Sequence, residues 1–60
     1  MNRKETILEF LKDEKIPPVN AEEIMLYLDI PFDDKEELME ILDSLTRENL
    51  IIKTSKKKYC

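Results

Sequence analysis

The chain has 60 residues, of which 40% are charged and 42% hydrophobic, and its formal net charge at pH 7 is −4. This length allows one small domain whose core cannot support a deep catalytic cleft. Histidine is absent and Cys60 is the single cysteine, which excludes histidine-based acid–base chemistry, an internal disulfide and a thiolate zinc cluster. We therefore expect a domain without catalytic residues, cofactor, metal site or small-molecule ligand.

The cysteine content and the apolar runs favour a cytoplasmic protein. A single cysteine suits a reducing compartment. The sequence begins MNRKE, and no apolar run of the kind found in signal peptides follows. The longest apolar runs, at residues 24–28 and 50–52, are far too short to span a bilayer. No membrane contact is expected.

The first element expected is a helix that begins after Asn2. Asparagine is a preferred N-cap residue, and Glu5 three positions later gives an asparagine version of the capping box. Apolar residues then recur at the spacing of one helix face, at Ile7, Phe10 and Leu11. The helix is expected to fade at residues 14–15, because the prolines that follow at Pro17 and Pro18 forbid its continuation.

A second helix is expected after a short extended segment at Val19. Asn20 is its N-cap residue, and Glu23 completes a second capping box. Its apolar face consists of Ala21, Ile24, Met25 and Leu28. A tight connection follows this helix, and in it Ile30 and Phe32 are both expected to point inward.

A third helix is expected to begin at Asp33 or Asp34 as the N-cap and to end near Glu48. Its apolar face consists of Leu38, Ile41, Leu42 and Leu45. An acidic stripe lies opposite, formed by Glu36, Glu40 and Asp43. Asn49 follows the helix where a left-handed cap is expected, because the chain has no glycine and asparagine is the best substitute there.

After Asn49 the pattern changes from helical to extended. Residues 50–54 are rich in β-forming side chains and predict a strand, 55–57 predict a turn, and 58–60 predict the start of a returning strand. Three helices followed by a basic hairpin indicate a winged helix-turn-helix domain, mainly α with a two-stranded wing. Because the second strand is cut short, we expect residues 1–60 to be one domain and an N-terminal fragment of a longer chain.

Residues 50–59, with the sequence LIIKTSKKKY, resemble the segment that ends the N-terminal winged-helix domain of bacterial ribonuclease R, an RNB-family exoribonuclease. The helical part is similar to that domain's opening helices, so the resemblance covers essentially the whole chain, although its specific part is C-terminal. Asn49, Lys57 and Cys60 stand where glycine is common in the family. Lysine in the left-handed conformation of a turn glycine costs about 1–2 kcal/mol.

The resemblance implies a parent enzyme that degrades RNA hydrolytically from its 3′ end. It also implies further RNA-binding domains and a catalytic domain that uses a metal ion, expected to be Mg²⁺. The family's clustered catalytic aspartates lie downstream of the region that this chain resembles. No acid of this chain therefore inherits a catalytic role.

The charge of the chain is divided between an acidic part and a basic end. Residues 1–49 contain six Lys or Arg and fourteen Asp or Glu, whereas residues 50–60 contain four lysines and no acid. We expect these lysines to contact RNA phosphates with weak, salt-dependent affinity, and Tyr59 to stack on a base. The lysines are Lys53, Lys56, Lys57 and Lys58. Alternatively, the lysines keep an edge strand soluble and Tyr59 packs inward.

The predicted third helix disfavours the reading of DNA in the major groove. Residues 33–48 carry seven acids against Lys35 and Arg47, and such a helix would repel phosphates.

The expected function is therefore that of a non-catalytic accessory domain that helps a ribonuclease R-like enzyme to engage structured RNA. The alternative is a module whose acidic third helix docks a basic protein or another domain of the parent. A fragment of a DNA-binding regulator is less favoured.

Overall fold

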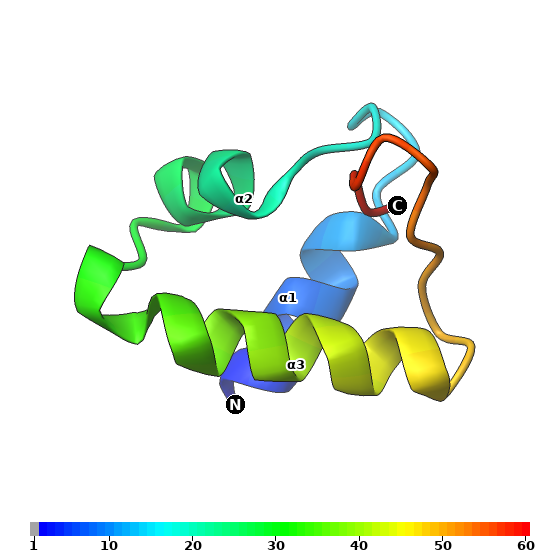
Figure 1. Cartoon of the computed structure of the whole chain (residues 1–60). Helices are drawn as coiled ribbons and strands as arrows, with labels where there is room; N and C mark the ends of the chain where they lie inside the picture. Colours follow the sequence, from blue (N-terminus) through cyan, green and yellow to red (C-terminus); the bar gives the residue numbers. More distant parts are fainter. Residues whose placement is uncertain (1) are drawn as a thin grey trace.

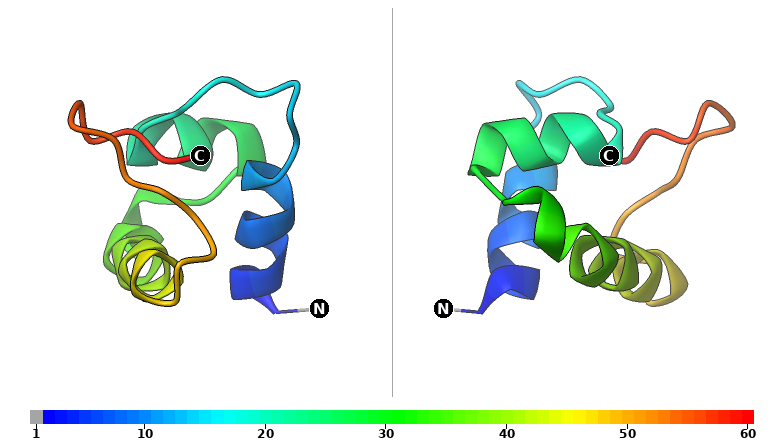
Figure 2. Two further views of the ribbon diagram at one scale, coloured as in Figure 1. Left: turned by 90° about the vertical axis from the view of Figure 1, so that its right-hand side faces the viewer. Right: turned by 60° about the vertical axis from the view of Figure 1, so that its left-hand side comes forward.

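The computed structural model describes residues 2–60 and contains three α-helices in this range (Figure 1). Helix α1 spans Arg3–Leu11, α2 spans Ala21–Leu28, the short 3-10 helix η1 spans Phe32–Asp34, and α3 spans Lys35–Arg47. After α3 the chain turns back and ends beside the segment that precedes α2 (Figure 2). The predicted mainly helical fold with three helices is confirmed.

Helix α1 begins where it was predicted to begin but ends earlier. The Asn2 side chain accepts a hydrogen bond from an amide of the first turn at 2.8 Å. The helix ends at Leu11, before the predicted end. Asp13 explains the difference, because its carboxylate accepts from the Lys15 amide at 2.9 Å and its carbonyl from the Ile16 amide at 3.1 Å. These local hydrogen bonds favour a turn over a continued helix.

Helix α2 has the predicted capping box. The Asn20 side chain accepts from the Glu23 amide at 2.8 Å, and the Glu23 carboxylate accepts from the Asn20 amide at 3.0 Å. In the absence of glycine, other residues take the left-handed conformation, with φ of 55° at Asp29, 61° at Asn49 and 61° at Lys57. The prediction of a left-handed cap at Asn49 is therefore confirmed.

The C-terminal end of α3 is closed by the pair of hydrogen bonds that defines a Schellman motif. The Leu50 amide donates to the Leu45 carbonyl at 3.0 Å, and the Asn49 amide donates to the Thr46 carbonyl at 3.1 Å. Both bonds satisfy carbonyls that would otherwise lack partners at the helix end. The left-handed Asn49 thus reverses the chain and directs it back over the helices.

Ion pairs connect both ends of α3 to α1. Asp34 is the N-cap residue of α3, but its side chain makes no capping bond and instead pairs with Arg3 at 3.1 Å. Glu37 pairs with the same guanidinium group. Lys4 pairs with Glu48 at 2.7 Å and, as the largest cause, lowers the pKa of that carboxyl below its ordinary value. These pairs are partly exposed, so water and salt screen them and each contributes little to stability.

The core contains side chains from all three helices and from the segments that flank them. Five aliphatic side chains of the helices are fully buried, and these are Ile7, Ile24, Leu38, Leu42 and Leu45. The other buried residues are Leu11, Val19, Ala21, Met25, Ile30, Ile51 and Tyr59. The apolar faces predicted from helical spacing are therefore those that pack together.

One prediction about the core is wrong. Ile30 is buried, as expected, but 76% of Phe32 is exposed. The Ile30 amide donates to the Met25 carbonyl at 2.9 Å, which fixes Ile30 against the end of α2. Phe32 begins η1, and this 3-10 turn carries its ring to the surface, where the Lys35 ammonium lies 5.8 Å from the ring centroid.

The C-terminal turn, residues 52–60, forms backbone hydrogen bonds within itself and to the segment before α2. Tyr59 forms antiparallel bridges to Val19 on one side and to Lys53 on the other. The Tyr59 amide donates to the Val19 carbonyl at 2.7 Å, and Ile52 and Cys60 exchange hydrogen bonds of 2.9 and 3.0 Å. These bridges are isolated, so the predicted two-stranded wing is not formed as regular strands in the described residues.

Candidate nucleic-acid interface

The four lysines predicted to contact RNA lie together on the C-terminal turn. Lys53, Lys56 and Lys57 are exposed, and Lys58 is half-buried. The Thr54 carbonyl accepts from the Lys57 amide at 3.0 Å, and the Thr54 hydroxyl accepts from the Lys58 amide at 3.1 Å. The turn projects from the helical body, as the orange and red trace in Figure 2 shows. The structure therefore brings these ammonium groups to one corner of the molecule.

None of these lysines forms an ion pair within the part of the chain that the structure describes. The four ion pairs of residues 2–60 all join side chains of α1, α2, η1, α3 and its C-cap residue. Lys53 contacts an aromatic ring, with its ammonium group 5.9 Å from the Tyr59 ring centroid. The charges of the turn lysines are thus not neutralised by carboxylates of the same molecule, and they are available to an external anion.

A hollow of about 320 Å³ lies between the C-terminal turn, the first residues of α2 and the exposed side of α3. Lys53, Lys56 and Lys57 line it from the turn, and Lys35 and Met39 line it from α3. Sequence reasoning missed Lys35, because only the folded chain brings it beside the turn. Lys35 forms an ion pair of 2.9 Å with Glu22 of α2, so its charge is partly neutralised.

Tyr59 does not have the role that was expected for it. Its side chain is 2% exposed and belongs to the apolar core, so its ring is not available to stack on a base. The alternative, that Tyr59 packs inward, is confirmed. Burial raises the pKa of the Tyr59 hydroxyl and the negative charge of Asp43 raises it further, so the hydroxyl is neutral at physiological pH. Tyr59 anchors the turn and does not bind a ligand.

The acidic stripe predicted for the third helix is present on the surface of α3. Glu36, Glu40 and Asp43 are all exposed. A nucleic acid placed along this face would be repelled, since its phosphates would meet carboxylates and release no counterions. The stripe therefore disfavours phosphate contact along this face of α3.

The positive φ of Lys57 gives a first prediction. Lys57→Gly is expected to raise the free energy of unfolding by about 0.5–1 kcal/mol, because the left-handed conformation costs lysine about 1–2 kcal/mol and glycine almost nothing. Part of the gain is offset by the greater freedom of glycine in the unfolded chain. Urea unfolding followed by circular dichroism measures the change. Lys56→Gly is the control and should be neutral or destabilising, since φ is not positive at Lys56. Equal effects of the two changes would contradict the argument.

Residues 2–60 contain neither a cluster of three or more metal-ligating side chains nor a membrane-spanning helix. Within residues 2–60, no group of three or more His, Cys, Asp or Glu side chains is arranged to hold a metal ion. No helix in the same range combines the length and the apolar character needed to cross a bilayer. Comparisons with the models of known protein families and with curated proteins found no match to this chain.

Proposed function

We propose that the chain is a non-catalytic accessory domain that binds RNA weakly through its C-terminal turn. The observation that carries the proposal is the gathering of four lysine ammonium groups at one corner, none of them in an ion pair with a described residue. Cations that form no ion pair at a protein surface bind a phosphate chain through the release of its counterions. Four of them supply a contact of low affinity that weakens as salt is added.

The proposed contact is made to the phosphate backbone and not to base edges. Lysine ammonium groups act as point charges, and Tyr59, the aromatic residue of the turn, is buried. Contacts to phosphates position a protein on a nucleic acid without reading its sequence. A strand that enters the hollow beside the turn would also meet Lys35, provided that this lysine leaves Glu22. RNA binding is therefore expected to depend on charge and shape and to be independent of sequence.

The proposal includes a winged helix-turn-helix fold. Its support is that three helices are followed by a turn in which isolated bridges join Tyr59 to Val19 and to Lys53. The resemblance of residues 50–59 to the end of the ribonuclease R domain supports the same assignment. We further propose a cytoplasmic, Mg²⁺-dependent exoribonuclease as the parent, whose other domains are partners of this one. Tethering would then raise the effective concentration of a weak contact.

An NMR titration of the ¹⁵N-labelled chain with a short RNA hairpin tests the contact directly. Amide shifts are expected at residues 53–58 at about 50 mM salt, and they should fade at about 200 mM because each phosphate contact is salt-dependent. Shifts centred on the acidic stripe of α3, or no shifts at either salt concentration, would contradict the proposal.

Matched charge variants then assign the contact to the turn. In the double variant Lys56→Gln/Lys57→Gln, RNA affinity at about 50 mM salt should fall about tenfold or more, and the slope of log K against log salt should become shallower by about 1.4–1.8. The control Lys12→Gln/Lys15→Gln removes the same charge from exposed positions outside the turn and should leave the slope nearly unchanged. If both variants lowered affinity equally, net charge and not the turn would be responsible.

A further inference from the structure

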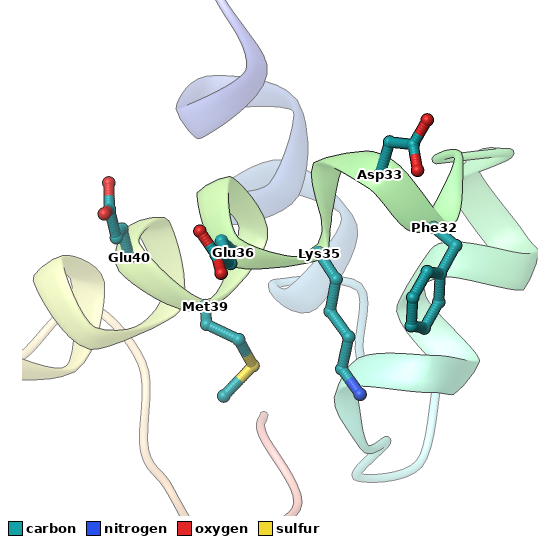
Figure 3. Close-up of a pocket in the computed structure, with 6 residues that line it drawn as sticks. All are labelled: Phe32, Asp33, Lys35, Glu36, Met39 and Glu40. Carbon is teal, nitrogen blue, oxygen red and sulfur yellow. The ribbon is translucent and has the colours of Figure 1, made fainter.

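A second exposed surface adjoins the hollow beside the C-terminal turn, since Lys35 and Met39 line both, and it extends from there toward Phe32. Phe32, 76% exposed, lines a hollow of about 580 Å³ together with Met39 and Lys35. Figure 3 shows these three side chains extending to the same side of the chain. Phe32 also lines a hollow of about 410 Å³ together with Leu26, which is 83% exposed. We call these two hollows together the Phe32 groove; apolar surface exposed in this way commonly marks an interaction site.

The Phe32 groove is bordered by negative charge. Five carboxylates line the two hollows, those of Glu22, Asp29, Asp33, Glu36 and Glu40. The single cation of the lining is Lys35, and it is already paired with Glu22 at 2.9 Å. Charge complementarity therefore selects a positively charged segment that also presents an apolar side chain.

The C-terminal turn of the same chain has this chemistry. Its four lysines form no ion pair with described residues, and beside them Ile52 is 67% exposed and Leu50 is 45% exposed. The turn lies beside Lys35 and Met39 of its own molecule, but η1, which carries Phe32, lies at the left of Figure 1 and the turn lies at the right. One molecule therefore cannot place its turn against its own Phe32 ring, whereas a second molecule can.

We propose that the Phe32 groove binds the C-terminal turn of a second copy of this chain. Ile52 packs against Phe32, and the turn lysines face the carboxylates that border the groove. Because the groove and the turn are different surfaces, the contact is heterologous and joins molecules head to tail. The turn is a minor part of a total surface of 4500 Å², so the interface is smaller than a standard one and the association is transient. This proposal does not rest on RNA binding.

Sedimentation velocity of the chain at about 20 μM to 1 mM tests the association at low and at moderate salt. The weight-average mass should rise with concentration at about 20 mM NaCl and return to that of the monomer at about 300 mM, where surface charges are screened. The Cys60→Ser form is used, since the exposed thiol of Cys60 could link molecules covalently. Concentration-dependent amide shifts should occur at both the Phe32 groove and the turn. A chain that stays monomeric at about 1 mM in low salt overturns the proposal and leaves the groove to another protein.

Paired charge variants distinguish this specific contact from nonspecific electrostatic attraction between molecules. Glu36→Lys/Glu40→Lys reverses charge at the groove, Lys56→Glu/Lys57→Glu reverses it at the turn, and each variant alone is expected to be monomeric. None of these four residues forms an ion pair with a described residue. The control Glu9→Lys/Glu14→Lys makes the same change of charge as the groove variant at exposed positions that do not line the groove, and it should associate like the parent chain.

A mixture of the groove variant and the turn variant should associate again. The unchanged basic turn of the groove variant meets the unchanged acidic groove of the turn variant, and the two reversed surfaces also complement each other. Net attraction cannot explain such rescue, because each Glu→Lys or Lys→Glu change shifts the net charge of −4 by two, which leaves one variant neutral and makes the other more acidic. Association that persists in the groove variant alone, or a mixture that stays monomeric, would refute the assigned surfaces.

Discussion

Tyr59→Ala is expected to lower the free energy of unfolding by about 3–5 kcal/mol, the range for removing a large aromatic side chain from a core. A domain of this size rarely has more than about 3–5 kcal/mol in total, so the variant should be largely unfolded at room temperature. The structural reason is that Tyr59 is 2% exposed and is bridged through its backbone to both Val19 and Lys53. Loss of the ring removes core contacts and the support of the C-terminal turn together.

Tyr59→Phe is the matched control for this prediction. It keeps the buried ring and removes only the hydroxyl, so the free energy of unfolding should change by less than about 1.5 kcal/mol. Thermal and urea unfolding followed by far-ultraviolet circular dichroism measure both variants. If Tyr59→Ala were as stable as Tyr59→Phe, the ring would not belong to the core, and the C-terminal turn would be held by its hydrogen bonds alone.

The parts of the fold that could be predicted from the sequence are those set by local physics. Asn2 and Asn20 cap their helices because a short side-chain acceptor lies within reach of the first free amides. Asn49 takes the left-handed conformation because the reversal after α3 requires it and no glycine is present. Helical spacing likewise identified Leu38, Leu42 and the other buried faces before any tertiary contact was known.

The parts that could not be predicted depend on contacts between residues far apart in the sequence. Asp33 or Asp34 was expected to cap α3. Asp34 takes the N-cap position, but its carboxylate pairs with Arg3 of α1 at 3.1 Å, and local patterns contain no sign of that partner. Tyr59 alternates with exposed residues, so the pattern permitted either face, and the bridge to Val19 decided that it points inward. Contacts with residues far away in the sequence therefore decided the position of both side chains.

The C-terminal turn and the Phe32 groove also differ in how far they could be predicted from the sequence. The turn lysines are close together in the sequence, and no acidic residue lies among them. Such a cluster of positive charge can be recognised from the sequence alone. The Phe32 groove combines side chains of α2, η1 and α3, and its existence depends on Phe32 leaving the core. Phe32 was expected to point inward because phenylalanine is among the residue types that are most often buried.

Leu42→Ala is expected to cost about 2–5 kcal/mol of the free energy of unfolding, because Leu42 is 0% exposed and its removal leaves a cavity in the core beneath α3. Leu26→Ala makes the same chemical change on α2 at a position that is 83% exposed, and it should change stability by less than about 0.5 kcal/mol. Urea unfolding of both variants at neutral pH gives the comparison.

The same pair of variants separates the role of the core from the role of the Phe32 groove. Leu26→Ala should fold normally yet weaken the concentration-dependent association, because it trims the groove without disturbing the core. Leu42→Ala should lose structure throughout, since α3 carries both the buried Leu42 and the carboxylates of Glu36 and Glu40 on its exposed side. If Leu26→Ala destabilised the chain as much as Leu42→Ala, Leu26 would support the fold, and its exposure would be no evidence for a docking surface.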